Sequence, residues 1–471
     1  MKSRLRVPLT PLLAVLLAVV LPASVTGQQC YEPLDSDPYL FFSHKTAYQL
    51  IYNSKFKPVP YCRPTFVWMF IRHGTSYPTA NESSAIRQLH LFKDRVINNH
   101  EERRDGHLCK SVQDSLKRWE FEVNPMSEDD ISPQGKMDMR LMAKRTRDKL
   151  SEVLAREFDR NTFKFYSSED RKVMNSAEEF SRGMFGDDFK SKISIETVHN
   201  NSSFIGLESC PKWQTPTNDV HPEALRFRSS PEYVKMVGQI SARLGFLDNI
   251  TDSIVHAMYE SCRYNKALVL NSFPAWCGLF TRQELQLLEY YEDLDFYYKY
   301  GYGSDFNVKV GCPIAHELLG YLNDAAKEQK DSPSAVFRFG SSAGLLTTLI
   351  ALDMAKDSVP LTHANYHSQY RRQWRMSQVD PFSGNLAAVF YKCDQGDEEN
   401  KVMFYLNEGV YDYPGCNVGL CSWKFIQEKF KKYLGPNECG QVCHDHSLAS
   451  AVGNAFVLMV TLLTAHIFVR S

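Results

Sequence analysis

Short runs of apolar residues along the chain predict the strands of a buried β-sheet. The first run, residues 65–70, reads Thr-Phe-Val-Trp-Met-Phe. A continuous apolar run of this length, bounded by turn residues, is typical of a strand that is covered on both faces. Four later segments are predicted to be strands of the same sheet: residues 163–166, 335–339, 385–391 and 402–406.

Helical patterns alternate with these strands. Residues 136–145 carry apolar residues at helical spacing and follow a Ser-Pro-Gln-Gly turn at residues 132–135. Helices are also predicted over residues 176–185 and 343–356, the second beginning after a Gly-Ser-Ser turn at residues 340–342. Strands that alternate with helices predict an α/β fold.

The middle of the chain has a different character. Helical periodicity and aromatic residues dominate residues 210–312, and no β-branched residue occurs in residues 284–294. We therefore predict an α/β core formed by residues 28–209 and 313–440, interrupted by a helical cap domain of residues 210–312. The catalytic cleft is expected between core and cap.

Both ends of the chain carry targeting patterns. Residues 1–27 combine basic residues, an aliphatic run at 12–21 and small residues at 23–27, which predicts a secretory signal peptide. A membrane-spanning helix is the alternative, although the apolar run is short for it. Residues 447–471 combine small residues with an apolar tail, which indicates a GPI-attachment signal. A short anchor helix and an amphipathic closing helix are the alternatives for this tail.

The cysteines and glycosylation sequons agree with export. Twelve cysteines in an exported chain predict a disulfide framework. Close spacing favours three bridges, Cys262–Cys277, Cys416–Cys421 and Cys439–Cys443, and sequence alone does not pair the other cysteines. A zinc site at Cys439, Cys443, His444 and His446 is disfavoured in an oxidising compartment. Four Asn-x-Ser/Thr triplets begin at Asn81, Asn200, Asn201 and Asn249.

Net charge limits the possible partners. The formal net charge is -1, and no basic stripe of the kind that nucleic-acid binding requires is present, so no nucleic-acid partner is predicted. A pocket for a polyanion would have to be basic locally. His363 and His367 have the i, i+4 spacing of metal ligands but no evident third ligand, so neither a metal nor a cofactor is predicted.

Candidate chemistry begins where the first strand ends. A strand that breaks at Gly74 would present Arg72 and His73 together at its carboxyl end, where ligands usually bind in open α/β sheets. The guanidinium can hold phosphate oxygens while a neutral imidazole attacks phosphorus. A strand that merely ends in two polar residues is the alternative.

The segment Arg72-His73-Gly74-Thr75, followed by Tyr-Pro-Thr at 77–79, resembles the signature of the histidine acid phosphatases, in particular the multiple inositol polyphosphate phosphatase branch. Residues 163–171, 380–386 and 405–408 resemble later segments of that family. The resemblance implies a histidine-phosphatase-like mixed sheet flanked by helices, with an inserted helical cap. It also implies that inositol polyphosphates are the substrates, that His73 is the nucleophile and that Arg72 and Arg171 hold the phosphate.

Three positions depart from the family pattern. Ser76 stands in place of a second motif arginine, Ser341 in place of a phosphate-binding histidine, and Ala343 in place of the proton donor. Ser341 lies before the helix predicted over residues 343–356, where free backbone amides still favour an anion, so it remains a predicted substrate-binding residue. Loss of an acid typically lowers the rate by about 10²–10⁴. Two hypotheses follow: a phosphatase of reduced turnover, or a non-catalytic protein that binds phosphorylated ligands or a cell-surface partner.

Overall fold

The computed structural model describes residues 30–31, 38–53, 58–155, 161–198, 220–396, 398–435 and 439. The predicted signal peptide and the predicted GPI signal lie outside these residues, as do the sequons at Asn200 and Asn201. Asn81 and Asn249 are exposed, as glycosylation requires. Within the described ranges, no helix is both long enough and apolar enough to span a bilayer.

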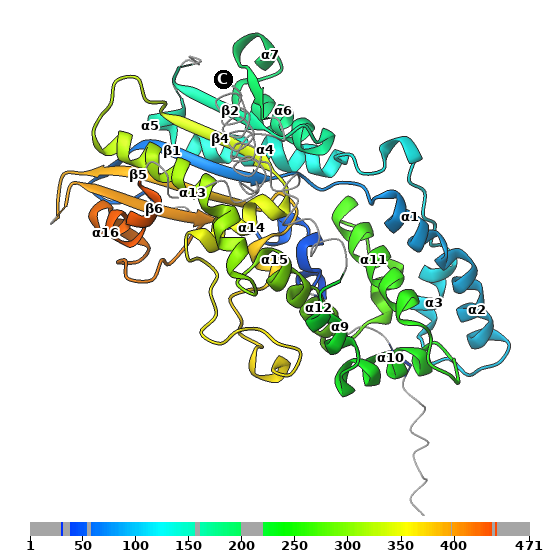
Figure 1. Ribbon diagram of the computed structural model, residues 1–471. Coiled ribbons are helices and arrows are strands. Elements are labelled where there is room, and N and C mark those ends of the chain that lie inside the picture. The colour runs from blue at the N-terminus through cyan, green and yellow to red at the C-terminus, as the bar shows by residue number, and fades with distance from the viewer. Residues whose placement is uncertain are drawn as a thin grey trace, which may run out of the picture.

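One mixed β-sheet forms the centre of the molecule (Figure 1). Its main path runs in the order β3-β2-β4-β1-β5-β6-β7, and β8 pairs with β6. The strands are β1 (Cys62–Arg72), β2 (Phe163–Ser167), β3 (Ile195–Thr197), β4 (Ala335–Gly340), β5 (Asn385–Cys393), β6 (Asn400–Leu406), β7 (Gly409–Val410) and β8 (Leu420–Ser422). All five predicted strands are therefore present.

Strand direction changes across the sheet. Strands β3, β2, β4 and β1 are parallel to one another. Strand β5 pairs antiparallel with both β1 and β6. The carboxyl ends of β1, β4 and β2 consequently lie at one edge of the sheet. This arrangement matters for function because the chain after each of these three strands contributes to the same cavity.

Alternating side chains of β1 explain why helices cover both faces of the sheet. Val67, Met69 and Ile71 pack into a buried cluster with residues of α4 (Pro133–Lys149) and α6 (Arg171–Phe185). The intervening residues of the strand enter a second cluster with α13 (Asp305–Ala326) and α14 (Ser342–Ala351). A strand that is apolar on both faces has to be covered twice.

Three helices differ in extent from their predictions. Helix α4 runs from Pro133 to Lys149 rather than over residues 136–145, so that residues 133–135 belong to the helix and not to a turn before it. Helix α6 begins at Arg171 rather than at residue 176, because Asp170 caps its first turn by accepting hydrogen bonds from the backbone amides of Lys172 and Val173. Helix α14 ends at Ala351 rather than at residue 356. Asp353 follows with a φ of 55°, which takes the chain out of the helical conformation.

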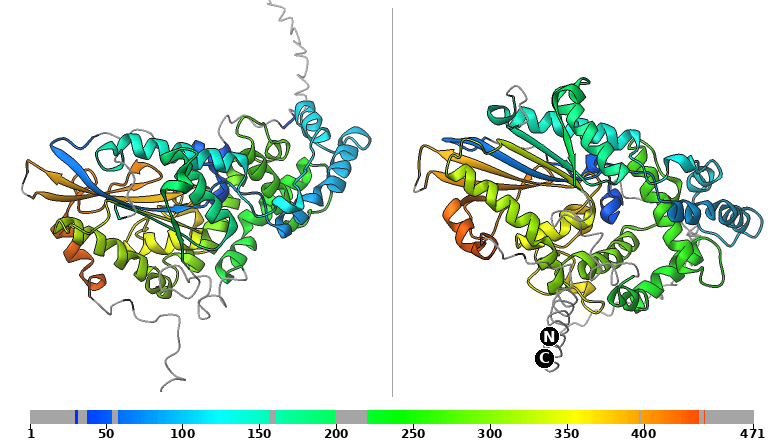
Figure 2. Two further views of the ribbon diagram at one scale, coloured as in Figure 1. Left: turned by 90° about the horizontal axis from the view of Figure 1, so that it is seen from above. Right: turned by 45° about the horizontal axis from the view of Figure 1, so that its top comes forward.

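A group of helices lies beside the sheet. It contains α9 (Pro222–Arg228), α10 (Pro231–Arg243), α11 (Asp252–Leu268) and α12 (Arg282–Tyr300). Helices α1 (Ala80–Arg87), α2 (Leu89–Glu101) and α3 (Lys110–Lys117) pack against this group, and Figure 2 shows them next to α11. The boundary predicted at residues 312–313 falls inside α13, which runs along α14. The division into core and cap stays a prediction.

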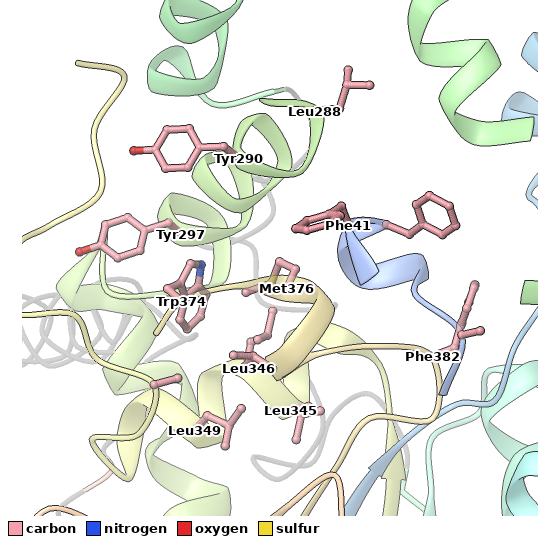
Figure 3. Packing of buried hydrophobic residues seen from close by; sticks show 14 of the residues in the cluster. Phe41, Leu288, Tyr290, Tyr297, Leu345, Leu346, Leu349, Trp374, Met376 and Phe382 are labelled. Atoms are coloured by element: carbon pink, nitrogen blue, oxygen red, sulfur yellow. The ribbon is translucent and has the colours of Figure 1, made fainter. Parts of the chain in front are cut away.

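Aromatic packing joins the helical group to the sheet. Tyr297 of α12 lies edge-on to Trp374, with 6.0 Å between ring centroids. Figure 3 shows these rings above Leu345 and Leu346, which belong to the first turns of α14. Helix α14 is thus held between the sheet and α12. The remaining α-helices of the described residues are α5 (Ser151–Leu154), α7 (Phe189–Lys192), α15 (Met376–Val379) and α16 (Trp423–Lys429).

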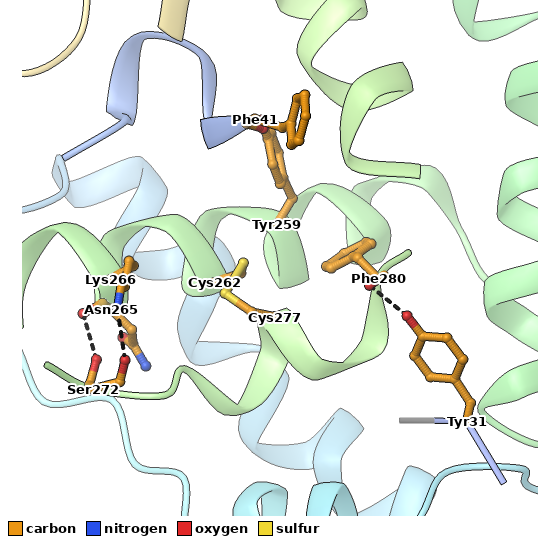
Figure 4. Close-up of a disulfide and its surroundings, with 9 residues drawn as sticks. All are labelled: Tyr31, Phe41, Tyr259, Cys262, Asn265, Lys266, Ser272, Cys277 and Phe280. Atoms are coloured by element: carbon orange, nitrogen blue, oxygen red, sulfur yellow. Dashed lines mark hydrogen bonds between the residues drawn. A yellow bond between two sulfur atoms is a disulfide. The ribbon is translucent and has the colours of Figure 1, made fainter. Parts of the chain in front are cut away.

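Five disulfides connect the described cysteines. The predicted bridges Cys262–Cys277 (Figure 4) and Cys416–Cys421 are confirmed. The predicted pair Cys439–Cys443 is wrong, because Cys439 is bonded to Cys312, 127 residues earlier. This bond also removes Cys439 from any zinc site. The other bridges are Cys30–Cys109 and Cys62–Cys393. Such a framework fits a secreted or extracellular protein.

Candidate active site

The candidate site lies where β1, β4 and β2 end. Arg72 is the register partner of Gly340, and the backbone amide of His73 donates to the carbonyl of Gly340 at 3.1 Å. The chain after β4 therefore lies directly beside the Arg72-His73 pair. A cavity of about 640 Å³ opens at this edge, and both residues line it together with Ser76 and Ser341.

His73 forms part of the cavity wall. Its side chain is buried apart from 6% of its surface, and Nδ1 lies 2.9 Å from the carbonyl oxygen of Gly74. The carbonyl can only accept, so Nδ1 carries the proton and the lone pair is on Nε2. Burial lowers the pKa of His73 well below its usual value, and the nearby charges of Arg72 and Lys172 lower it further. The ring is thus neutral and nucleophilic.

Close packing fixes the backbone around His73. A Cβ on Gly74 would lie 2.8 Å from Cδ1 of Ile131 and 2.9 Å from the carbonyl oxygen of Gly135, so only glycine fits. The amide of Gly74 donates to the hydroxyl of Ser176 at 2.9 Å, and that hydroxyl donates to the carbonyl of Lys172. Helix α6 therefore holds the motif in place.

The segment 380–386 supports the motif from its other side. The amide of Arg72 donates to the carbonyl of Gly384 at 2.8 Å, and the amide of Ser383 donates to the carbonyl of His73 at 3.1 Å. Phe382 lies beside both side chains, with its ring centroid 5.2 Å from the Arg72 guanidinium carbon and 6.3 Å from the His73 ring. This explains why the family resemblance extends to this segment.

Arg72 is held rigidly in the cavity floor. Its Nη1 donates to the carbonyls of His44, at 2.6 Å, and Asp380, at 2.7 Å. Its Nε has no hydrogen-bond partner among the residues that the structure describes. A buried donor without a partner is costly unless a ligand accepts from it. The side chain fits its predicted role as a phosphate-binding arginine.

The start of α14 forms another part of the cavity wall. Ser341, Ser342 and Ala343 all line it, and Ser341 precedes the helix without using its side chain as a cap. The free amides and the dipole of the helix N-terminus favour an anion at this position. Ser341 is therefore placed where its predicted role in substrate binding requires. Ala343 lies where a proton donor would stand and supplies no proton.

The prediction for Arg171 needs a correction. Its side chain is 57% exposed, pairs with Asp130 at 3.5 Å and donates to the carbonyl of Glu128, and it does not line the cavity. Lys172 lines the cavity instead. Successive helical side chains point about 100° apart, so the start of α6 can turn only one of these two residues inward.

Sequence reasoning missed Lys45 and Glu82. Both line the cavity and form a close ion pair, and Lys45 also donates to Glu260 at 2.9 Å. Burial raises the pKa of Glu82, but the charge of Lys45 and hydrogen bonds from Lys45 and Thr79 together lower it more strongly, and the net pKa is well below its usual value. A buried lysine at this position had no evident signal, because its partners come from distant parts of the sequence.

The described residues include no cluster of three or more His, Cys, Asp or Glu side chains that could hold a metal ion. His363 and His367, which have ligand spacing, pair separately with Glu223 and Glu232. The arrangement of the cavity is that of a phosphoryl-transfer site, with a neutral imidazole, a buried guanidinium, a lysine and a helix N-terminus around one space.

Comparison with known protein families agrees with this assignment of a phosphoryl-transfer site. The model of the histidine phosphatase superfamily (branch 2) matches residues 65–407. The chain belongs to this superfamily. The match covers the Arg72-His73 motif and the segments 163–171 and 380–386, and it ends within the segment 405–408, so the predicted resemblance is confirmed.

Several relatives carry the name multiple inositol polyphosphate phosphatase 1. The Drosophila melanogaster protein is 32% identical over 438 residues, which cover 90% of this chain and 92% of the relative. The Homo sapiens protein is 25% identical over 410 residues, covering 81% and 82%. These names give no support to the non-catalytic alternative.

Solved structures of a phytase and of a multiple inositol polyphosphate phosphatase share the fold. The phytase from D. castellii matches with a TM-score of 0.69 at 16% identity, covering 85% of this chain and 88% of its own. The Bifidobacterium longum multiple inositol polyphosphate phosphatase, in complex with inositol hexasulfate, matches with a TM-score of 0.59 at 11% identity, covering 86% and 100%. The predicted fold class, a mixed sheet flanked by helices, is confirmed.

Proposed function

We propose that this chain is a phosphomonoester hydrolase that acts on inositol phosphates through a phosphohistidine on His73. The observation that carries the proposal is the hydrogen bond from Nδ1 of His73 to the Gly74 carbonyl, which leaves the lone pair on Nε2 inside the cavity wall. We propose inositol polyphosphates as the substrates because relatives of this chain are named multiple inositol polyphosphate phosphatase 1.

The reaction has two displacements at phosphorus. Nε2 of His73 attacks the phosphate, a P–N bond forms, and the P–O bond to the alcohol breaks. Water then attacks the phosphohistidine, the P–N bond breaks, and inorganic phosphate leaves. Arg72, Lys172 and the N-terminus of α14 stabilise the charge that spreads over the phosphoryl oxygens in both steps.

The leaving alcohol receives no proton from the family's usual position, where Ala343 stands. The carboxylates that line the cavity are Glu82, Asp129 and Asp170, and each is paired with Lys45 or Lys172. The alkoxide therefore takes its proton from solvent, and turnover depends on how readily the alcohol leaves.

The deciding experiment compares phosphate release by the purified protein with release by His73→Ala, from inositol hexakisphosphate, inositol monophosphate and an aryl phosphate across acidic pH. Release from the aryl ester above the level of the variant supports the proposal. Equal release from both proteins with all three substrates would contradict it.

We also propose that the chain is exported after cleavage of residues 1–27 and is held at the cell surface by a GPI anchor that replaces the tail of residues 447–471. Treatment of expressing cells with a phosphatidylinositol-specific phospholipase should release the protein into the medium. Retention on the cells after this treatment would contradict the anchor.

A further inference from the structure

The phosphate-binding cavity contains few unpaired cations. Among its described lining residues, the lysines and arginines are Lys45, Arg72 and Lys172. Two histidines also line it, and burial lowers the pKa of both, that of His44 to about 4 and that of His73 well below its usual value. Neither ring is charged near neutral or mildly acidic pH.

Each cation already has a carboxylate partner. Lys45 pairs with Glu82 and with Glu260. Arg72 lies 3.4 Å from Oδ2 of Asp380. Two carboxylates therefore balance Lys45, and Asp380 balances Arg72 at neutral pH, where its carboxyl group is ionised.

Lys172 is neutralised in the same way. It contacts Asp129 at 2.5 Å and Asp170 at 3.8 Å, and both acids line the cavity. Arg171, the nearest further cation on α6, is paired with Asp130 outside the cavity. The lining therefore carries three formal positive charges, listed above, and three formal negative charges, on Glu82, Asp129 and Asp170.

The rest of the described wall is aromatic or consists of small side chains, four of which carry hydroxyl groups: Ser76, Thr79, Ser341 and Ser342. Five aromatic side chains line the cavity: Tyr77, Tyr264, Phe296, Tyr300 and Phe382. Aromatic walls suit the ring of a substrate better than additional phosphate groups, which charged donors bind more strongly than neutral hydroxyl groups do. A substrate with six phosphates would bring its outer phosphates close to the three lining carboxylates.

We infer that this cavity selects phosphate esters with one or two phosphate groups and discriminates against inositol hexakisphosphate. The inference rests on the proposed function, because it concerns the substrate class of the same site. The first phosphate uses Arg72 and the N-terminus of α14, and further phosphates meet cations that are already neutralised.

Direct binding separates this inference from the proposal of catalysis. Calorimetry with His73→Ala, which cannot be phosphorylated, gives dissociation constants for inositol monophosphate and inositol hexakisphosphate without turnover. We expect the monophosphate to bind at least about tenfold more tightly. Equal or tighter binding of the hexakisphosphate would overturn the inference, whereas the proposed function depends separately on turnover of the aryl ester by the unmodified protein.

A single substitution tests whether the lining carboxylates weaken the binding of inositol hexakisphosphate. Asp129→Asn removes the partner of Lys172, and asparagine accepts the φ of 58° that residue 129 adopts. Hexakisphosphate affinity should rise about tenfold, and monophosphate affinity should change by less than about threefold. The matched control is Asp187→Asn, which removes an acid from the ion pair with Arg182 outside the cavity and should change neither constant. Unchanged hexakisphosphate affinity in Asp129→Asn would contradict the electrostatic argument.

Discussion

Asp380 lies beside Arg72, which lines the cavity, and its Oδ2 is 3.4 Å from Nη1 of the arginine. The carboxyl group is fully buried, and neither of its oxygens has a hydrogen-bond partner among the described residues that meets normal geometry. Burial raises the pKa of Asp380 to about 6, although Arg72 and the neighbouring Ser342 both oppose the shift. The charge that balances the phosphate-binding arginine therefore depends on pH.

Anion binding should consequently strengthen in acid. Above pH 6, Asp380 is ionised and neutralises Arg72, and below pH 6 it is protonated, so that Arg72 attracts an anion more strongly. Sulfate is a suitable probe because its own charge is constant in this range. Its dissociation constant should fall about tenfold between pH 7 and pH 5, the equivalent of about 1.4 kcal/mol.

Asp380→Asn should abolish this pH dependence and bind sulfate tightly at both pH values. The control is Asp138→Asn, which changes another buried carboxyl whose pKa burial raises to about 6, but whose partners are Gln49 and Gln134 rather than Arg72. If Asp138→Asn also removes the pH dependence, or Asp380→Asn retains it, the Arg72–Asp380 pair is not its source.

Lys172 and Arg171 should differ in their contributions to substrate binding. Lys172→Ala removes a cation that lines the cavity, and KM for an aryl phosphate should rise about tenfold, as expected for loss of a hydrogen bond to a charged group. Arg171→Ala removes an exposed side chain and should change KM by less than about threefold. A larger effect of Arg171→Ala, measured by steady-state kinetics, would favour the assignment made from sequence.

Ser176 should matter more than a comparable serine one turn further along α6. Ser176→Ala leaves the buried Gly74 amide without its partner, which costs about 1–3 kcal/mol in free energy of unfolding and loosens the loop that carries His73. Ser181 is also buried and donates to the carbonyl four residues earlier, but does not contact the motif. Denaturant unfolding and kcat should therefore change clearly in Ser176→Ala and little in Ser181→Ala, and equal changes would contradict this account.

The sequence predicts the sheet well because its signal is local. The apolar run at residues 65–70 and the breaking residue Gly74 are enough to place Arg72 and His73 at a strand end, where the structure has them. Contacts between distant residues are different. Arg72 meets the carbonyl of Asp380 across 308 residues, and Gly74 meets Ser176 across 102.

The errors have the same origin. Short spacing suggested the pair Cys439–Cys443, but the fold brings Cys312 to Cys439. Arg171 was expected in the cavity from its place in a motif, and the exact start of α6 decides that Lys172 lines it instead. Neither the helix rotation nor the bridging partner can be read from neighbouring residues.

Restoration of the missing acid should raise turnover of substrates whose alcohol leaves poorly. With Ser341→His and Ala343→Glu together, hydrolysis of an alkyl phosphate should rise by at least about 10²-fold. Ser341→His with Ala343→Gln has nearly the same shape but no acidic proton, and it should show no such gain. Equal kcat values for the two double variants would mean that residue 343 does not face the leaving group.

The central claim is that His73 is phosphorylated during turnover. Rapid quenching with alkali during hydrolysis of an aryl phosphate, followed by peptide mass spectrometry, tests it directly, because phosphohistidine survives alkali and is lost in acid. We expect phosphate on the peptide that contains His73, and none on the corresponding peptide of His73→Ala. Rapid turnover with no phosphate on His73, or with phosphate on another residue, would contradict the account.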